Sequence, residues 1–483
     1  MAGQVFKRWL YLTHRWIGIV TCLLFAMWFA SGLVMLYVPY PSLDRSEWVQ
    51  HQRPIDWAAV ETTPEDLALV EGSSALRKLS LEMRGDRPAW RRLGWDGEEA
   101  FYSALDGRPF SAPSESEIRG IAAMFAGLPV TRLETIRNDQ WTVSGRYDAH
   151  RPLWKADLAG EGGRTLYLSS KTGEVLLETT GRERFWNWLG SVPHWIYPTV
   201  LRQDNEAWRQ VVMWLAGPCI IAAVTGIWIG LLRVRLGKRR FKDGQISPYK
   251  GWMWWHHIPG LAGSLFLVLW VFSGWLSVDP GRLFTSKGPE LAQRQSYAGL
   301  VSGAADWPAL SKFTDARRVS ITSAAGRAYL RVEAPATADR DLDPVTLAPL
   351  GRDDPRILKA VHELYPASTI AGTELLERGD LYWFNTDGPL ALPVLRVILD
   401  DRAATWLHID PATGEVLSTL DTRGRTYRWV YTLFHRWDFP VLIEHRAGRH
   451  VLIWFFSLLG LITSVTAVKI GWDRLRRKRP KPR

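Results

Sequence analysis

The stretch HRWIGIVTCLLFAMWFASGLVMLY, residues His14–Tyr37, decides the fold class of this chain. From Ile17 onward it holds 21 residues without a charged side chain. Three further runs share this property, namely Val211–Leu232, Ile258–Val278 and Val451–Val468, of 22, 21 and 18 residues. A helix needs about 20 apolar residues to cross the ~30 Å hydrocarbon core of a bilayer. The sequence therefore predicts four transmembrane helices and excludes a single-domain soluble enzyme.

The positive charge gathers in the short segments between and beyond these runs. The 483 residues carry a formal net charge of +11. Residues 1–16 contribute +3, residues 233–257 +6 and residues 469–483 +7, so the two long segments sum to −5. Basic short segments mark the cytoplasmic side of a membrane protein. We therefore expect a multi-pass protein of the cytoplasmic membrane with both termini in the cytoplasm, membrane lipid as a partner, and no nucleic acid.

The chain also repeats itself at a nearly constant offset. His14-Arg-Trp-Ile-Gly18 lies opposite His256-His-Ile-Pro-Gly260 at an offset of 242 residues, and the same offset pairs Trp28 with Trp270 and Ser31-Gly32 with Ser273-Gly274. At 241, Thr172–Leu176 matches Thr413–Leu417. Such a register indicates a duplication. The predicted fold is an α-helical membrane protein with α+β extramembrane domains, in which four transmembrane helices form two parallel repeats and each repeat encloses one external domain.

Each external domain is predicted to combine helices with antiparallel sheet. Leu166–Leu176 and Trp406–Leu417 read as hairpins around a Thr-Gly-Glu-Val turn, and Phe101–Pro109 as an earlier hairpin. Ile118–Phe125 and Ile357–Leu364 have helical spacing. We interpret the Thr-Gly-Glu-Val turn as structural. The predicted organisation is a cytoplasmic N-terminus (1–16), span one (17–37), periplasmic domain one (38–210), span two (211–232), a basic cytoplasmic loop (233–257), span three (258–278), periplasmic domain two (279–450), span four (451–468) and a basic cytoplasmic tail (469–483).

Histidines stand at the edges of the predicted spans. Ionisable residues at membrane depth suggest function by default, and neutral imidazole is a common iron ligand. Two imidazoles can clamp one haem only from the same side of the membrane, which predicts two haem b groups stacked across the bilayer. The candidate cofactor ligands are His14 with His256 or His257 on the cytoplasmic side, and His194 with His435 on the external side, with His450 at the start of span four.

Other residues support this hypothesis or stand apart from it. Gly18 and Gly260 lie four residues beyond His14 and His256, on the same helix face, where a porphyrin would need room. The alternative is that span-edge histidines are ordinary anchors at the membrane interface. Both cysteines, Cys22 and Cys219, lie inside spans, so no disulfide, thiolate metal site or covalent haem attachment is expected. Arg15, Arg209, Arg436 and Arg449 are candidates for neutralising haem propionates, whereas His51, His150, His362 and His408 are expected to be external surface or loop residues.

These features together resemble the PepSY-associated transmembrane family. That family includes iron-regulated inner-membrane proteins of bacteria and siderophore-iron reductases of the ferrioxamine-reductase type. The resemblance covers about residues 5–472 and implies four spans, PepSY modules in the periplasm and two histidine-ligated haems. Residue by residue it points to His14, His256 or His257, His194 and His435 as ligands of haem iron.

Two functions of different classes follow from this reading. The favoured one is an inner-membrane electron-transfer protein that reduces a periplasmic ferric siderophore or other iron chelate, with haem carrying the chemistry and no protein side chain acting as acid or base. Its electrons would come from a cytoplasmic partner or a quinol, because no nucleotide-binding fingerprint is present. The alternative is a non-enzymatic PepSY scaffold that binds or inhibits a peptidase or senses an envelope signal. A transporter has less support, since no span contains an acidic residue.

Overall fold

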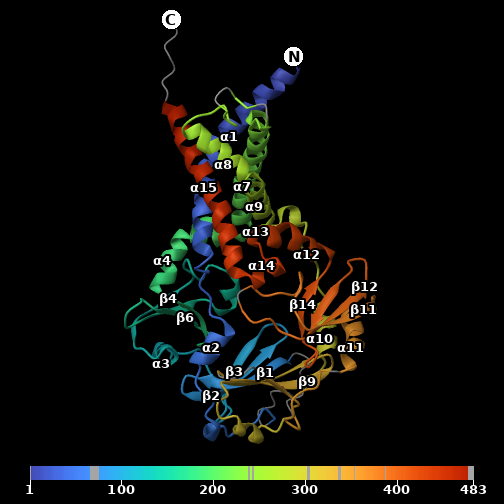
Figure 1. The fold of residues 1–483 in the computed structure, drawn as a ribbon. Coiled ribbons are helices and arrows are strands. Elements are labelled where there is room, and N and C mark those ends of the chain that lie inside the picture. The colour runs from blue at the N-terminus through green and yellow to red at the C-terminus, as the bar shows by residue number, and fades with distance from the viewer. Residues whose placement is uncertain are drawn as a thin grey trace.

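The chain folds into a helical bundle that stands on a group of antiparallel sheets (Figure 1). The computed structural model describes residues 2–65, 76–237, 240–241, 244–301, 305–335, 339–352, 354–386 and 388–476. Residues 477–483 of the basic tail lie outside the described residues. The first helix, which begins at Ala2, and the last helix, which ends at Arg476, both have these outer ends at the side of the bundle away from the sheets. We call this the terminal end and the opposite one the domain end.

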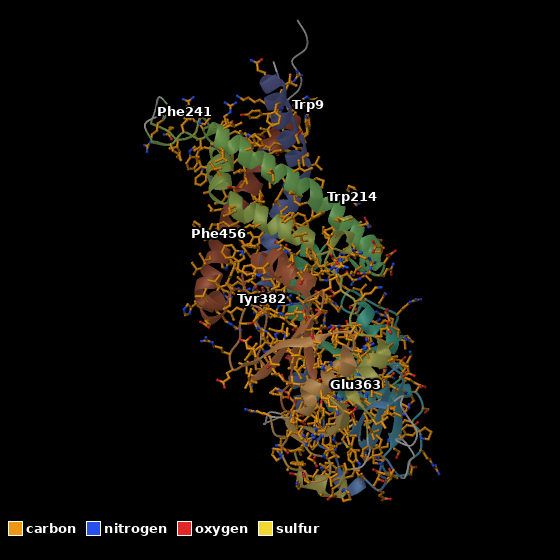
Figure 2. All side chains as sticks on the ribbon, turned by 90° about the vertical axis from the view of Figure 1, so that its right-hand side faces the viewer. Trp9, Trp214, Phe241, Glu363, Tyr382 and Phe456 are labelled. Carbon is orange, nitrogen blue, oxygen red and sulfur yellow. The ribbon has the colours of Figure 1, made fainter. Side chains whose placement is uncertain are left out.

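Within the described residues, three helices of the bundle are long and apolar enough to cross a membrane. They are α1 (Ala2–Met35), α7 (Asn205–Arg233) and α15 (Arg446–Arg476). In each of them only 28% of the most apolar 18-residue window is buried within the protein. The outward surface is correspondingly apolar, and Trp214, 73% exposed, projects from α7 (Figure 2). A helix that is apolar on its outer face as well as its inner face is typical of a membrane span.

The predicted third span is broken in the structure. Helix α8 (Trp252–Ala262) meets α9 (Ser264–Leu276) at an angle of 71°, so the pair counts as a fourth span only if it is taken as one bent unit. Pro259 has no N–H to donate to the preceding turn, and the N–H of Gly263 bonds to the Pro259 carbonyl at 2.8 Å. The sequence prediction of an uninterrupted span at 258–278 therefore lacked both the early start at Trp252 and this bend.

Strands from both halves of the chain build one six-stranded sheet. The strand order is β10-β9-β8-β1-β2-β3. β1 pairs antiparallel with β8, and Ser80 stands opposite Ser320 with their hydroxyl oxygens 3.0 Å apart. On the core side Trp90 is fully buried and packs edge-on against Trp307. The strands are β1 (Leu76–Arg84), β2 (Arg87–Gly94), β3 (Glu99–Ser103), β8 (Arg318–Ala324), β9 (Arg327–Glu333) and β10 (Arg340–Leu342).

Two four-stranded sheets lie between the six-stranded sheet and the bundle (Figure 1). The predicted hairpins are confirmed in both of them, with Gly173 and Gly414 at positive φ in the two turns. The two predicted helices are also confirmed as α3 (Glu115–Ala126) and α11 (Arg356–Leu364). The sheets consist of β4 (Val130–Ile136), β5 (Leu153–Leu158), β6 (Thr165–Ser169) and β7 (Val175–Thr179), and of β11 (Thr369–Leu376), β12 (Val394–Asp400), β13 (Trp406–Ile409) and β14 (Val416–Leu420).

Short helices connect the sheets to one another and to the bundle. Helix α2 (Arg45–His51) contributes to the core of the first four-stranded sheet, and α10 (Leu291–Ala298) to that of the second. The short helices η1 (Trp57–Ala59) and η5 (Pro308–Lys312) pack on the core of the six-stranded sheet. The segment between β4 and β5 contains η2 (Gly145–His150). The loops and turns leading to the bundle contain α4 (Gly181–Leu189), α5 (Ser191–His194), α6 (Thr199–Arg202), η4 (Pro280–Arg282), α12 (Thr422–Tyr427), η6 (Arg428–Leu433), α13 (Phe434–Arg436) and α14 (Pro440–Glu444).

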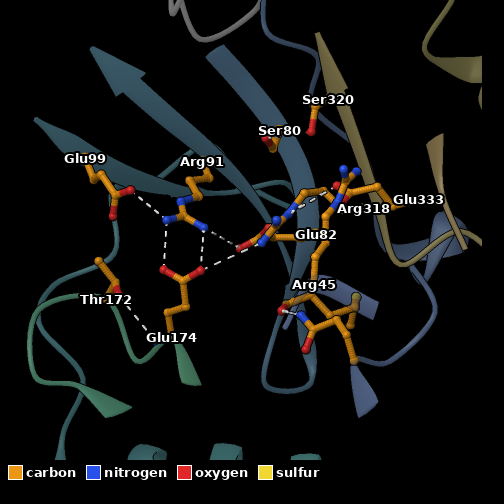
Figure 3. A network of polar contacts seen from close by, with 12 residues as sticks. Arg45, Ser80, Glu82, Arg91, Glu99, Thr172, Glu174, Arg318, Ser320 and Glu333 are labelled. Atoms are coloured by element: carbon orange, nitrogen blue, oxygen red, sulfur yellow. Dashed lines mark hydrogen bonds and ion pairs between the residues drawn. The ribbon is translucent and has the colours of Figure 1, made fainter. Parts of the chain in front are cut away.

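A buried ion network joins the first four-stranded sheet to the six-stranded sheet (Figure 3). Glu174, from the Thr-Gly-Glu-Val turn, accepts two hydrogen bonds from Arg91 at 3.0 and 2.8 Å, and Glu99 accepts another at 2.6 Å. The corresponding turn of the second half behaves alike, since Glu415 bonds to Arg331 at 3.1 Å. The turn is therefore structural, as the sequence indicates, and it also anchors one sheet to the next.

Candidate functional site

Two histidines face each other inside the bundle near its terminal end. His14 projects from α1 and His256 from α8, and their ring centroids are 6.3 Å apart. The Nδ1 atom of His14 lies 3.0 Å from the carbonyl oxygen of Ala222, and that of His256 lies 3.0 Å from the carbonyl oxygen of Thr463. A carbonyl only accepts, so in both rings Nδ1 carries the proton. Nε2 is then the nitrogen left with a free lone pair in each ring.

A second pair lies at the domain end of the bundle. Helix α5 packs on α1 and brings His194 there, while α13 packs on α9 and brings His435, with ring centroids 6.2 Å apart. The Nδ1 atoms lie 3.0 Å from the hydroxyl oxygens of Ser31 and Ser273, respectively. Burial lowers the pKa of His194 to about 3 and that of His435 to about 4. Both imidazoles are therefore neutral at physiological pH, as metal ligation requires.

The separation of the rings fits one metal ion held between two imidazoles. A metal–nitrogen bond is about 2.0 Å long and a ring nitrogen lies roughly 1.2 Å from its ring centroid, so two imidazoles on opposite sides of one ion have centroids about 6.4 Å apart. Both pairs agree with this value. Within the part of the chain that the structure describes, no three His, Cys, Asp or Glu side chains gather as a metal site. Each pair can thus offer two imidazole ligands to one ion.

A large cavity surrounds the terminal-end pair. It has a volume of about 870 Å³, within the range of roughly 300–1,000 Å³ typical of sites for small molecules and cofactors. His14, His256 and Gly18 all line it. A Cβ atom added at Gly18 would meet no protein atom within 4 Å, whereas one at Gly226 would lie 2.7 Å from Cε1 of His14. Gly226 lets the ring approach α7, and Gly18 leaves open space in the cavity beside the ring.

Cationic side chains also line this cavity. They are Arg15, Arg233, Lys250 and Arg474, and the guanidinium of Arg233 donates to the Tyr11 hydroxyl at 2.6 Å. Carboxylates pair favourably with such groups. Of the other arginines expected to face propionates, Arg209 donates to the carbonyl oxygens of Val278 and Asp279, and Arg449 donates to that of Arg436. Of these predicted arginines, Arg15 is the one that lines the cavity.

The neighbouring His257 differs from His256 in the hydrogen-bond partners of its two ring nitrogens. Its Nε2 lies 3.1 Å from the carbonyl oxygen of Gly230, so Nε2 must carry the proton, and Nδ1 accepts from the Ser247 hydroxyl at 2.8 Å. Both nitrogens of this buried ring are thereby occupied. The geometry favours His256 over His257 as the partner of His14.

The remaining histidines lie apart from the two pairs. His450 lies in α15 with its ring 5.6 Å from that of Tyr37. His51 and His362 are exposed, as expected for surface residues, and His150 is half-buried. The expectation is wrong for His408, which is fully buried in β13, accepts a hydrogen bond from Arg396 and stacks on Trp383. Its position in β13 directs this side chain into the core. The expectation of a surface position rested on the lack of a repeat partner, which does not indicate the direction of a side chain.

The residues that hold the histidines were not predicted from the sequence. Ser31 and Ser273 appeared only as repeat matches, although their hydroxyls contact the domain-end rings. The offset of 242 residues between the two serines, the same as that of the repeat, was the sequence signal that could have identified them. The acceptors Ala222 and Thr463 are also separated by the repeat offset, but they act through backbone carbonyls, which every residue type possesses.

The family model described as the PepSY-associated TM region matches residues 11–326. This range contains His14, His194 and His256, and it ends in the turn between β8 and β9. No curated protein matches the chain.

Proposed function

Because the chain belongs to the PepSY-associated TM region family, we propose that it is an inner-membrane di-haem b electron-transfer protein that reduces ferric chelates, with ferric siderophores as the substrate class. The observation that carries this proposal is the occurrence of two imidazole pairs, one at each end of the bundle, with centroid separations of 6.3 and 6.2 Å. The resemblance to siderophore-iron reductases supports the choice of substrate.

The proposed ligands are His14 with His256, and His194 with His435. In each ring a hydrogen bond at Nδ1 fixes the imidazole and leaves Nε2 for iron. Haem bound in this way supplies one-electron transfer, and Fe(III) that gains one electron becomes Fe(II), which siderophores hold poorly. Under this proposal His257 and His450 have structural roles.

The proposed topology assigns a side of the membrane to each end of the bundle. The terminal end would face the cytoplasm, in agreement with its basic segments, and the sheets would lie in the periplasm. The two halves would be parallel repeats, which is supported by the repeat offset shared by Ala222 and Thr463 and by Ser31 and Ser273. A cytoplasmic or quinol donor would meet the chain near the large cavity, and the chelate would meet the extramembrane domains.

An absorption spectrum of detergent-purified protein tests the proposal. The expected result is a Soret band with sharp α and β bands after dithionite reduction, at about two haems per chain by pyridine haemochrome. His14→Ala should remove one haem, and His194→Ala the other. Protein that is folded, expressed with ample haem and free of absorption above 400 nm would refute the proposal. Full haem content in both variants would refute the ligand assignment.

A further inference from the structure

The same five-residue pattern, Trp-x-x-Ser-Gly, contacts a domain-end histidine in each half of the chain. It occurs as Trp28–Gly32 in α1 and as Trp270–Gly274 in α9. In the first copy all three specified residues contact His194, and in the second copy all three contact His435. Each residue of the pattern acts on a different part of its histidine.

The serine determines which ring nitrogen carries the proton. Ser31 donates its single hydroxyl proton back into its own helix, to the carbonyl oxygens of Met27 at 2.6 Å and Trp28 at 3.2 Å. The hydroxyl oxygen can then only accept from His194, so Nδ1 of that ring is protonated and Nε2 is not. Ser273 donates to the Trp270 carbonyl and stands in the same relation to His435.

The tryptophan and the glycine fix the position of the histidine. The indole N–H of Trp28 donates to the backbone carbonyl of His194 at 3.0 Å, and that of Trp270 to His435 at 3.1 Å. A Cβ atom at Gly32 would lie 3.2 Å from Cε1 of His194. At Gly274 the corresponding distance to Cε1 of His435 is 3.3 Å. Glycine therefore allows the ring edge to lie directly against the helix backbone.

We propose that the Trp-x-x-Ser-Gly pattern is a positioning element that presents Nε2 of His194 and His435 to iron and sets the basicity of these ligands. The inference rests on the proposed function, because it concerns how the chain's own residues hold a ligand. The domain-end pair uses side-chain acceptors, whereas the terminal-end pair uses backbone carbonyls of Ala222 and Thr463. At the terminal end the Thr225 hydroxyl also lies 3.4 Å from Nδ1 of His14, farther than the Ala222 carbonyl, so the domain-end pair is the one whose nearest acceptors can be removed by substitution.

The test is Ser31→Ala in the full-length protein, studied by redox titration and low-temperature electron paramagnetic resonance. Loss of the acceptor makes the imidazole less basic, so the midpoint potential of one haem should rise and its g-values should change, while the other haem keeps its wild-type values. Removal of such a partner typically weakens metal binding about 10- to 100-fold. Ser273→Ala, at the equivalent position of α9, should affect the same haem.

Thr21→Val is the matched control, because Thr21 also bonds back to a carbonyl of α1, that of Ile17 at 2.9 Å, and among the described residues its hydroxyl forms no hydrogen bond with a histidine. Should Ser31→Ala fail to fold, Ser273→Ala and Gly32→Ala provide the same readout. Unchanged potentials and g-values in the folded serine variants, with two haems bound, would overturn this inference alone. Absence of haem from the wild-type protein would instead overturn the proposed function.

Discussion

Replacement of Gly18 by leucine should weaken cofactor binding without lowering the stability of the protein. Gly18 lies in the middle of α1 and lines the large cavity, and a Cβ atom there would meet no protein atom within 4 Å. Leucine has a higher helix propensity than glycine by up to about 1 kcal/mol, so the protein without cofactor should be at least as stable as the wild type. Overpacking of a filled site usually costs about 1–3 kcal/mol, and haem affinity at the terminal end should fall roughly 5- to 150-fold.

The assay compares two quantities in Gly18→Leu and in the wild type. Thermal unfolding of protein expressed under haem limitation gives the first, and haem titration of the same preparation gives the second. Gly3→Leu is the matched control, because Gly3 also lies in α1 with no atom within 4 Å of an added Cβ and does not line the cavity. A Gly18→Leu protein with wild-type affinity at both haem sites would refute the placement of a cofactor against this face of α1.

Three further outcomes are expected. His256→Ala should lose one haem per chain by pyridine haemochrome, whereas His257→Ala should keep two, since both nitrogens of His257 bond within the protein; the reverse result would exchange the two assignments. Glu174→Gln should lower the free energy of unfolding by about 3 kcal/mol in denaturant titrations, because it breaks a buried ion pair with Arg91. Glu415→Gln should cost about 1 kcal/mol or less, since that side chain is 43% exposed, and equal losses would contradict the argument. Burial alone would raise the pKa of Glu174, but Arg91 and Arg318 outweigh it and hold the pKa below its ordinary value. The stabilisation from Glu174 should therefore be present above the ordinary pKa of a glutamate and decline as the pH falls toward and through the lowered pKa of the folded state, where wild type and Glu174→Gln should converge in stability.

Several features of the fold could be predicted because they depend on local patterns. Runs without charge identified the membrane helices, and the Thr-Gly-Glu-Val turns identified two hairpins that the structure confirms. The bend at Gly263 was not predicted, because a run of apolar residues indicates a hydrophobic segment but carries no information on the direction of the helix axis. Pro259 was the available signal for this break.

The six-stranded sheet shows a different kind of limit. β1 and β8 belong to different halves of the chain, and no local pattern indicates that their edges pair. The histidine pairs were predicted as candidates from the repeat and from their positions at span edges. The choice between His256 and His257 required hydrogen-bond partners from two other segments, the Thr463 carbonyl and the Ser247 hydroxyl, which a sequence cannot bring together.

The pairing of β1 with β8 also has a consequence for synthesis of the protein. Ser80 and Ser320 are partners across this seam and are separated by 240 positions. At about 5–20 residues per second, a ribosome needs roughly 10–50 s to extend the chain from one to the other. Throughout that interval β1 has one open edge, and an open strand edge is a template for wrong pairing. A nascent chain of this length needs either a chaperone at that edge or rapid completion of its second half.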